Sequence, residues 1–281
     1  MNCFFVTDLH GKPDRYRKLF DLIHQEVPEV VLFGGDLLPH RLRKVEEFED
    51  FTTDFLFPQL LKLKKELKDK YPAILIILGN DDPRSEEEKF IHAANDGLFH
   101  YIHHQKITLL NYNFYGYSYV PPSPFQLKDW EKYDVSRYVD PGCIAPTEGF
   151  RTTEPNEDIE YATIQKDLVA LTGTDDLSKA IMLFHSPPYQ TQLDRAALDG
   201  KMIDHVPMDV NVGSIAIKRF IEERQPLITL HGHIHESTRL TGYWQQLIGN
   251  TLAFNASHDG PELSIIIFRP DEHAGGERLI I

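Results

Sequence analysis

Short apolar runs that end abruptly in Gly, Asn or charged residues recur along the first 80 residues of the chain. Residues 2–7, 30–33 and 73–78 are such runs, and their nearly continuous apolar character is typical of strands buried on both faces of a sheet. Between the first two runs, residues 14–27 carry apolar side chains at helical spacing, at Tyr16, Leu19, Phe20, Ile23 and Val27. Strands and helices that alternate at these lengths predict right-handed crossovers and a largely parallel sheet.

The middle of the chain has a different pattern. Residues 45–70 are charged but carry helically spaced apolar side chains, and Pro58 predicts a break or kink there. Residues 108–120 form a tyrosine-rich, strand-like run. The following residues 121–156 hold many Pro, Gly and charged residues, so we expect a long irregular excursion that could border a substrate cleft. Residues 156–171 then predict a helix.

The last third of the chain returns to alternating strands and helices. Residues 181–184 predict another buried strand, and a second long loop excursion follows at residues 190–212. Ser214 is a favourable N-cap for an amphipathic helix that ends near Arg224. Residues 226–230 predict the next strand. Three further strand-like runs predict an antiparallel meander that forms or completes a second sheet, at residues 245–248, 252–255 and 263–268.

Five short runs of metal-binding residue types follow these apolar stretches. They are Asp8-Leu9-His10, Gly34-Gly35-Asp36, Gly79-Asn80-Asp81-Asp82, His185 and Gly232-His233-Ile234-His235. In a parallel sheet the carboxyl ends of the strands meet at one edge, which would bring these runs together. The seven residues with oxygen or imidazole donors that suit a metal are Asp8, His10, Asp36, Asn80, His185, His233 and His235. Seven ligands suffice for two metal ions that share one carboxylate, so the sequence predicts a dinuclear centre.

The spacing within these runs suggests how two side chains of one short segment could bind the same metal ion. Side chains two residues apart in an extended segment lie on the same side, so both members of Asp-x-His and of His-x-His would face one ion. A glycine before Asp36, Asn80 and His233 is expected to allow a tight turn at each strand end. The mixed oxygen and imidazole donors suit Mn, Fe, Zn, Co or Ni, with Mn favoured, and the histidines argue against Mg alone.

Length and charge narrow the function classes further. The chain has 281 residues, and because the predicted ligands at 8 to 235 must meet in space, we expect a single domain over residues 1–281. The excursions at 121–156 and 190–212 would be loops of that domain. The formal net charge of −14 would repel a phosphate backbone, so no binding to long nucleic acid is expected. Two divalent ions would reverse the field locally for a small anionic substrate.

Cysteine usage and apolar run length bear on location. Cys3 and Cys143 are the only two cysteines, too few for a disulfide framework, and two reduced thiols are the expected state. The chain has no run of the roughly 18 apolar residues that a membrane helix needs, and no signal-peptide core precedes Asp8. We therefore expect a soluble, cytoplasmic protein without a membrane partner. The sequence carries no signal for an oligomeric state.

Taken together, the five runs resemble the motifs of the calcineurin-like metallophosphoesterases, from Asp8 to His235. The resemblance implies an α/β fold in which two mixed β-sheets pack as a sandwich flanked by helices, with a dinuclear metal centre at one edge. It also implies a hydroxide between the ions that attacks phosphorus in line while the metals stabilise the transition state. By the same resemblance, the first ion would be held by Asp8, His10, Asp36 and His235, and the second by Asp36, Asn80, His185 and His233.

One position departs from the family pattern. The third run is commonly Gly-Asn-His-Asp or Gly-Asn-His-Glu, whose His helps stabilise the transition state and protonates the leaving group, and here that position is Asp81. The Asp that often orients this His is replaced as well, by Pro39. Asp81 is a candidate catalytic residue at this position, but an aspartate would be a poor acid at neutral pH unless its pKa were raised, and two cations nearby would lower it. A good leaving group, or another acid such as His40 or His205, would then be needed.

Several other polar and aromatic residues have two interpretations. Arg195 could clamp a phosphate or form an ordinary salt bridge with a neighbouring Asp. His231 is expected to pack against or support the site from behind rather than to bind metal. A cluster expected to be solvated surface comprises His100, His103 and His104. A cluster expected to pack in the core rather than to stack on substrate comprises Tyr117, Tyr119 and Trp130.

The sequence thus predicts a metal-dependent phosphoesterase that acts on a small phosphorylated metabolite or nucleotide. Because the usual histidine acid is absent, phosphodiesters are favoured over monoesters with poor leaving groups. The alternative is a non-catalytic metal-binding scaffold on the same fold, although seven intact ligands argue against it. A DNA nuclease is disfavoured by the net charge of −14 and by the absence of a basic stripe.

Overall fold

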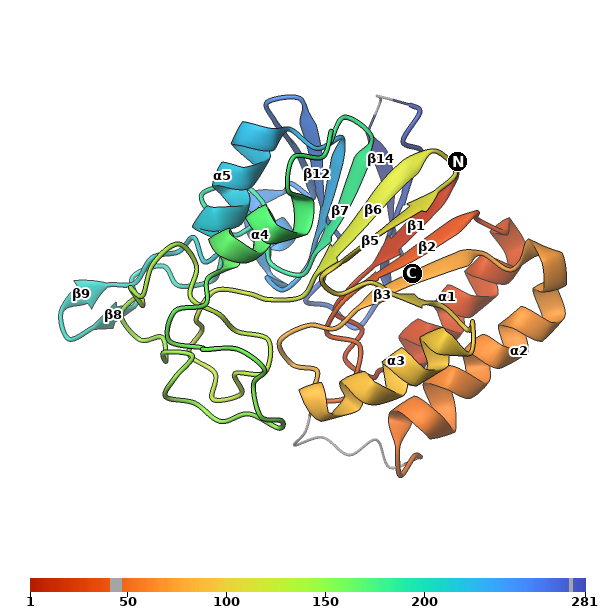
Figure 1. Ribbon diagram of the computed structural model, residues 1–281, viewed down its shortest axis with the longest axis horizontal. Coiled ribbons are helices and arrows are strands. Elements are labelled where there is room, and N and C mark those ends of the chain that lie inside the picture. The colour runs from red at the N-terminus through yellow and green to blue at the C-terminus, as the bar shows by residue number, and fades with distance from the viewer. Residues whose placement is uncertain (41–46, 273–274) are drawn as a thin grey trace.

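Two six-stranded sheets packed against each other form the centre of the molecule (Figure 1). The computed structural model describes residues 1–40, 47–272 and 275–281. The first sheet has the order β14-β13-β1-β2-β3-β4, in which β1 to β4 are parallel and β13 runs antiparallel to β1. Its strands are β1 (Cys3–Val6), β2 (Val30–Gly34), β3 (Ala73–Ile77), β4 (His100–Tyr101), β13 (Ser264–Phe268) and β14 (Gly276–Ile280).

The second sheet has the order β11-β12-β10-β7-β6-β5. Its four central strands are parallel, and an antiparallel strand closes each edge. Its strands are β5 (Gln105–Leu109), β6 (Tyr112–Tyr117), β7 (Ala180–Phe184), β10 (Ile228–His231), β11 (Gln245–Ile248) and β12 (Thr251–Asn255). Both sheets are therefore mixed, as predicted.

Helices cover the outer face of each sheet. The helices α1 (Pro13–Glu26), α2 (Phe57–Leu67) and α3 (Glu87–Asn95) lie over the first sheet, and α4 (Ile164–Thr172) and α5 (Ile215–Arg224) over the second (Figure 1). Alternate strand residues divide between two apolar layers, because successive side chains of a strand point to opposite faces. Phe5 and Leu32 pack between the sheets, whereas Phe4 and Val31 belong to the outer apolar cluster. The predicted sandwich of two sheets flanked by helices is confirmed.

Three short helical segments, a one-turn helix and a small hairpin complete the described structure. They are the π-helix η1 (Thr52–Leu56), the 3-10 helices η2 (Lys68–Lys70) and η3 (Arg84–Glu86), helix α6 (Ser237–Thr241), and strands β8 (Met202–Ile203) and β9 (Val206–Pro207). The predicted disturbance at Pro58 is found as a change from π to α geometry, because α2 begins at Phe57 directly after η1. Residues 45–46 of that predicted segment lie outside the described residues.

Three predicted elements can be compared with their limits in the structure. The strand expected at 108–120 is the hairpin β5-β6, which turns at Leu110 and Asn111 with φ of 49° and 69°. The helix expected from residue 156 begins only at Ile164, where the Thr163 side chain accepts a hydrogen bond from the Lys166 backbone N–H. Ser214 caps α5 as predicted, with its hydroxyl accepting from the Ile217 backbone N–H.

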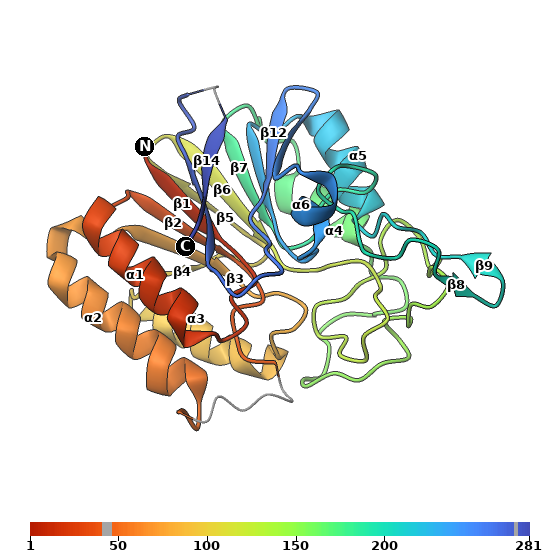
Figure 2. The same ribbon diagram turned by 180° about the vertical axis from the view of Figure 1, so that it is seen from behind.

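The predicted C-terminal antiparallel meander is confirmed for its first two strands and wrong for the third. Strands β11 and β12 extend the second sheet, but β13 crosses to the first sheet and pairs antiparallel with β1 (Figure 2). The reason is visible in β13 itself: Ile265 belongs to the outer apolar cluster and Ile266 to the layer between the sheets. A strand with apolar side chains on both faces needs cover on both faces, and the position beside β1 provides it.

In the described ranges 1–40, 47–272 and 275–281, no helix has the length and apolarity that crossing a membrane requires.

One histidine expected at the surface lies in the core. His100 and His104 are exposed, but His103 is buried, with its ring 4.8 Å from that of Trp130. Its Nδ1 accepts a hydrogen bond from the Ser118 backbone N–H at 3.1 Å, which requires a neutral ring. Burial, with a smaller effect of His104, lowers the pKa of His103 well below its ordinary value. The surface prediction is therefore wrong for this residue, whereas Tyr117, Tyr119 and Trp130 pack in the core as expected.

The buried neutral ring of His103 predicts a pH-dependent stability. The unfolded chain binds a proton at this position below pH ~6.5 and the folded chain does not, so stability is lost as the pH falls below that value. The loss from this residue is at most about 1.4 kcal/mol per pH unit. Urea denaturation of the His103→Gln protein should show a smaller loss of unfolding free energy between pH 7 and pH 5 than the native chain. His104→Gln, which changes an exposed ring, should keep the native profile, and identical profiles for all three proteins would contradict the assignment.

Candidate metal centre

The five predicted runs all lie directly after strands of the two sheets. Asp8 and His10 follow β1, Asp36 follows β2, and Asn80 follows β3 in the first sheet. His185 follows β7, and the pair His233 and His235 follows β10 in the second sheet. Because these parallel strands point the same way, the loops after them gather at one edge of the sandwich, as the alternation of strands and helices predicted.

One group of four side chains brings a ligand atom from each within 4.8 Å of the others, namely Asp8, His10, Asp36 and His235. His10 Nε2 lies 2.9 Å from His235 Nε2, and His235 Nε2 lies 3.4 Å from Asp8 Oδ1. Two imidazole nitrogens bound at about 2.1 Å to one ion, at right angles, would lie about 3 Å apart. The group therefore has the spacing of ligands around a single cation.

A second group shares Asp36 with the first. Ligand atoms of Asp36, His185 and His233 lie within 4.8 Å of one another, and His185 Nε2 lies 3.3 Å from Asp36 Oδ2. The Asn80 side-chain oxygen lies 3.0 Å from the same His185 nitrogen. The structure thus brings together all seven predicted ligands, in the two sets that the family resemblance implies, with Asp36 common to both.

The backbone at these residues differs from the extended geometry that the spacing suggested. Asp8, His10, Asp36 and His233 all have positive φ, at 56°, 48°, 52° and 72°. Side chains of such residues do not alternate as in a strand, so the two members of each motif converge because of left-handed turns. Positive φ is costly for residues other than glycine and is found where the surroundings enforce it, often at functional sites. Four strained ligand positions in one cluster are an independent sign of a functional site.

Two glycines allow the loops after β2 and β3 to touch. Gly35 has φ of 96°, and a Cβ added there would lie 2.6 Å from His185 Nδ1 and 2.9 Å from the Gly79 backbone. Gly79 has no positive φ, but a Cβ there would lie 2.4 Å from the Asp36 backbone nitrogen. The predicted tight turn is therefore confirmed at Gly35, whereas Gly79 is needed for close approach rather than for its backbone freedom.

Gly35→Ala is expected to disrupt metal binding. The new methyl group must displace His185 or the Gly79 backbone, either of which moves a ligand of the second set. We expect the isolated protein to bind fewer than two metal ions per chain, measured by elemental analysis after dialysis. Gly173→Ala provides the matched control, because Gly173 also has positive φ (47°) but nothing lies within 4 Å of its added Cβ. Equal metal content in both variants would mean that the contact at Gly35 is not needed.

The electrostatics of the cluster favour buried carboxylates that remain charged. Burial opposes ionisation of Asp36, but His185 and then His10 outweigh it and hold the pKa of this carboxyl at about 2. His185 in turn has its pKa raised to about 10, because Asp36 outweighs the effect of burial. The Gly34 carbonyl accepts from His185 Nδ1 at 2.7 Å, which leaves Nε2 directed at Asp36 and Asn80. Such a carbonyl partner fixes the ring of a metal-binding histidine.

Supporting contacts to Asp8 and between the loops were not predicted. Ser257 Oγ donates to Asp8 Oδ2 at 2.7 Å, and the fully buried Asp82 carboxylate accepts from the backbone N–H groups of Leu38 and Gly79 at 2.7 and 2.9 Å. Asp82 therefore ties the loop after β2 to the loop after β3. Its place at the end of Gly-Asn-Asp-Asp was the available signal, but a carboxylate that binds backbone cannot be told from a ligand by sequence alone.

The further predicted residues lie in three places: beside the cluster, away from it, and buried behind it. Asp81 lies beside the cluster, 25% exposed, with Oδ2 3.6 Å from His10 Nδ1, and the exposed His40 borders the same opening. Arg195 instead pairs with Asp199 at 2.5 Å, and His205 is exposed between β8 and β9, on the hairpin that projects from one side of the molecule (Figure 1). Neither residue lines either of the two clefts that open onto the cluster.

His231 is buried, and its ring nitrogens lie 2.9 and 2.8 Å from the Ser186 carbonyl and the Thr229 hydroxyl.

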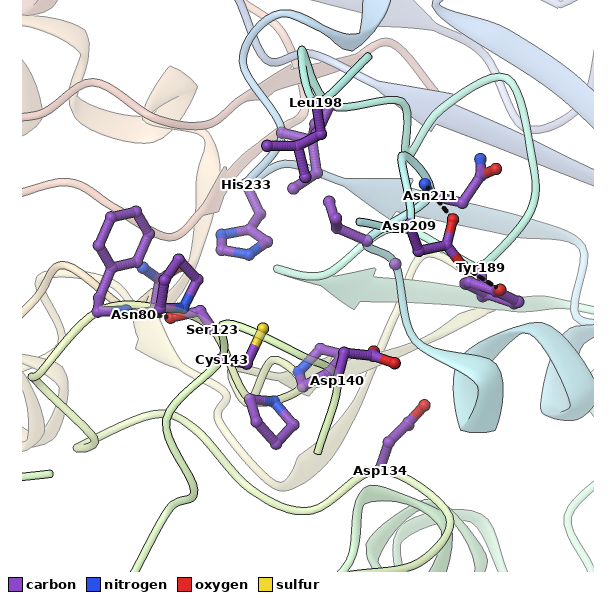
Figure 3. Close-up of a pocket in the computed structure, with 18 of the residues that line it drawn as sticks. Asn80, Ser123, Asp134, Asp140, Cys143, Tyr189, Leu198, Asp209, Asn211 and His233 are labelled. Atoms are coloured by element: carbon purple, nitrogen blue, oxygen red, sulfur yellow. Dashed lines mark hydrogen bonds between the residues drawn. The ribbon is translucent and has the colours of Figure 1, made fainter. Parts of the chain in front are cut away.

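Two clefts open onto the cluster. The first has a volume of about 380 Å³ and lies between the cluster and the excursions at 121–156 and 190–212, with Asn80 and His233 on one side and Asp209 and Tyr189 opposite (Figure 3). The second has a volume of about 870 Å³ and is bordered by the loop after β1, by His40 and by His258. Asp81 and His235 border both clefts. Both excursions therefore border a cleft, and that this cleft receives the substrate stays a prediction.

Comparison with known proteins agrees with this geometry. The calcineurin-like phosphoesterase family matches residues 1–237 of the chain. TT1561 of Thermus thermophilus superposes with a TM-score of 0.56 at 15% identity, over 99% of this chain and 98% of that one. A dimetal phosphatase from Danio rerio superposes with a TM-score of 0.52 at 12% identity, over 100% of this chain and 98% of that one. Both likenesses show the same fold, and no curated protein matches the chain in sequence.

The match covers every strand that precedes the predicted ligands and all five runs. The departure at Asp81 leaves both ligand sets intact. With its fold, its ligand groups and the family match over residues 1–237, the chain belongs to the calcineurin-like phosphoesterase family and is a metal-dependent hydrolase of phosphate esters.

Proposed function

We propose that Asp8, His10, Asp36 and His235 hold one divalent ion, and that Asp36, Asn80, His185 and His233 hold a second. The observation that carries the proposal is the convergence of two ligand groups on the shared, fully buried carboxylate of Asp36. Carboxylate, amide and imidazole donors without thiolate suit Mn, Fe, Zn, Co or Ni, and we favour Mn. Two such ions supply charge that stabilises phosphoryl oxygens and lower the pKa of water.

The two clefts beside the metal ligands indicate how a phosphate ester would be placed. Asp81 and His235 stand where the two clefts meet, so a phosphate at this point has room for an organic group on either side. A phosphate monoester carries one organic group and a diester carries two. The double opening therefore supports the preference for phosphodiesters that the absence of the usual histidine suggested. We propose small phosphodiesters of metabolites or nucleotides as the substrates.

The preference can be tested with matched aryl esters. Mn-loaded protein is given 4-nitrophenyl phosphate and bis(4-nitrophenyl) phosphate, beside a metal-free sample. We expect both esters to be hydrolysed only with metal, and kcat/KM to be higher for the diester. A higher kcat/KM for the monoester would contradict the diester preference and leave the phosphoesterase activity standing.

The second candidate function is a metal-binding scaffold without turnover, and the replacement of the usual His by Asp81 is the observation that favours it. Elemental analysis of the same preparations separates the two functions. Two bound ions without hydrolysis of either ester would support the scaffold, whereas turnover excludes it.

His40 is the side chain that we propose as proton donor to the leaving group. It borders the second cleft together with Asp81 and His235, whereas Arg195 and His205 border neither cleft. A general acid contributes on the order of 10² to 10⁴ to the rate when the leaving group needs its proton. His40→Gln should therefore lower kcat for methyl phosphodiesters by about 10² and change hydrolysis of 4-nitrophenyl esters less than about threefold. A uniform loss for both leaving groups would exclude proton donation by His40.

We further propose a cytoplasmic location and small phosphorylated substrates rather than long nucleic acid. The free thiols of Cys3 and Cys143 support a reducing compartment. The net charge of −14 supports the exclusion of a long phosphate backbone.

A further inference from the structure

The first cleft is lined by apolar, acidic and neutral polar side chains, and its described lining has no cationic side chain outside the ligand groups. Of the residues that the structure describes as lining it, none is Lys or Arg, and its two histidines, His233 and His235, belong to the ligand groups. Outside the ligand groups, the lining carboxylates are Asp81, Asp134, Asp140, Asp209 and Glu236. Cationic side chains are the strongest partners for a second phosphate or a carboxylate, and the described wall of this cleft has no Lys or Arg to supply one.

Two of these carboxylates face the end of the cleft opposite the metal ligands. Asp134 is buried and accepts hydrogen bonds from the Ser214 hydroxyl and the Ile215 backbone N–H at the start of α5, whereas Asp140 and Asp209 are exposed. Asp209 accepts from the Tyr189 hydroxyl at 2.5 Å and from the Asn211 backbone N–H at 2.8 Å, and it lies with Asp140 on the far side from His233 (Figure 3). Burial, and then the negative charge of Asp209, raise the pKa of the Asp140 carboxyl.

Large apolar side chains make up much of the remaining wall, and two of them are open to water. Phe125 and Tyr138, from the first excursion, are 55% and 69% exposed although both are large. Leu198 and Met208, from the second excursion, complete this wall and are half-buried. Exposed apolar side chains gathered in a cleft mark a binding surface for an apolar group.

The second cleft is mixed in charge. Its lining includes Lys12, Arg15, His40 and His258 beside the acidic Asp14, Asp81 and Asp259. The two sides of the metal ligands therefore differ: a substrate that spans them meets cationic side chains only on one side.

We propose that the first cleft receives an uncharged, largely apolar organic group of the phosphate ester and that Asp140 and Asp209 exclude an anionic one. The inference rests on the proposed phosphoesterase function. It assigns the substrate to esters with a single phosphate and at least one uncharged organic group, and it disfavours nucleoside diphosphates and triphosphates with a phosphate chain in this cleft. Repulsion between like charges across a binding site costs enough to reject a ligand.

The test compares bis(4-nitrophenyl) phosphate with bis(3-carboxy-4-nitrophenyl) phosphate. Both arms of the second ester are anionic, so one carboxylate must enter the first cleft in either orientation. We expect the Mn-loaded native chain to hydrolyse the neutral-armed ester with a kcat/KM at least about tenfold higher. In the Asp140→Asn/Asp209→Asn protein this ratio should fall at least about threefold, through faster hydrolysis of the anionic-armed ester.

A matched control carries the same change of net charge away from the clefts. Asp158→Asn/Asp204→Asn alters two exposed carboxylates that line neither cleft, and it should keep the native ratio. Equal kcat/KM for the two esters in the native chain, or the same fall in ratio in both double variants, would overturn the inference while leaving the phosphoesterase function intact. No hydrolysis of either ester would instead contradict the proposed function itself.

The apolar wall has its own readout. Phe125→Ala removes a largely exposed ring, so folding should be little affected. We expect KM for bis(4-nitrophenyl) phosphate to rise about fivefold or more with kcat nearly unchanged, the pattern of lost binding that is equal in ground state and transition state. An unchanged KM would mean that the organic group does not reach this wall.

Discussion

Replacing Asp36 with asparagine is expected to lower kcat/KM for bis(4-nitrophenyl) phosphate by on the order of 10⁴-fold. Asp36 is the one carboxylate common to both ligand groups, and it is fully buried between His10 and His185. Asparagine preserves the shape but removes the negative charge that both ions would share. The loss should be accompanied by a fall in bound metal, measured by elemental analysis of the same samples.

The control for this substitution is Asp21→Asn, which makes the same change in net charge on the exposed face of α1. It should keep native turnover and native metal content. An Asp36→Asn protein that still binds two ions and hydrolyses the ester at the native rate would show that Asp36 does not bridge the ions.

The largest expected effect on stability comes from Lys128. Its ammonium lies 2.5 Å from Glu131 Oε2, and both side chains are 0% exposed within the excursion that borders the first cleft. Lys128 Nζ also donates to the Ser123 carbonyl at 3.0 Å, and Glu131 accepts from the Ser123 backbone N–H. Lys128→Met leaves a buried carboxylate without its cation, which costs about 3–5 kcal/mol of unfolding free energy. Urea denaturation measures this loss.

The double variant Lys128→Met/Glu131→Gln tests the cause. It removes both charges and leaves an amide oxygen that can accept from Ser123, so most of the lost stability should return. A double variant that is less stable than Lys128→Met alone, or a single variant that loses less than about 1 kcal/mol, would show that the buried pair does not hold the excursion in place.

The sequence predicted those elements whose limits can be read from a single short run of residues. The strands β1, β2, β3 and β7 are continuous apolar runs that end within a residue or two of the predicted limits, and they position the predicted ligands. The seven predicted ligands converge because parallel strands end at one edge, which the order of elements already implied. The single-domain prediction stays a prediction, supported by β13, which completes the first sheet from the far end of the chain.

What could not be predicted depends on contacts between distant residues. The β5-β6 hairpin turns at Leu110 and Asn111, both with positive φ, and leucine gives no turn signal. His103 is buried by Trp130, which lies in the excursion at 121–156, and by Tyr119, which lies shortly after β6. The predicted ligands Asp8 and His233 owe their direction to left-handed turns rather than to the period of a strand. Spacing therefore predicted which residues meet, but not how the backbone brings them together.

The most direct test of the two-ion account is a titration of metal-free protein with Mn²⁺, in which bound metal and hydrolysis of bis(4-nitrophenyl) phosphate are measured in the same samples. We predict no turnover without metal and a maximum when two ions are bound per chain. Turnover that is already complete without metal, or absent with two ions bound, would contradict the account.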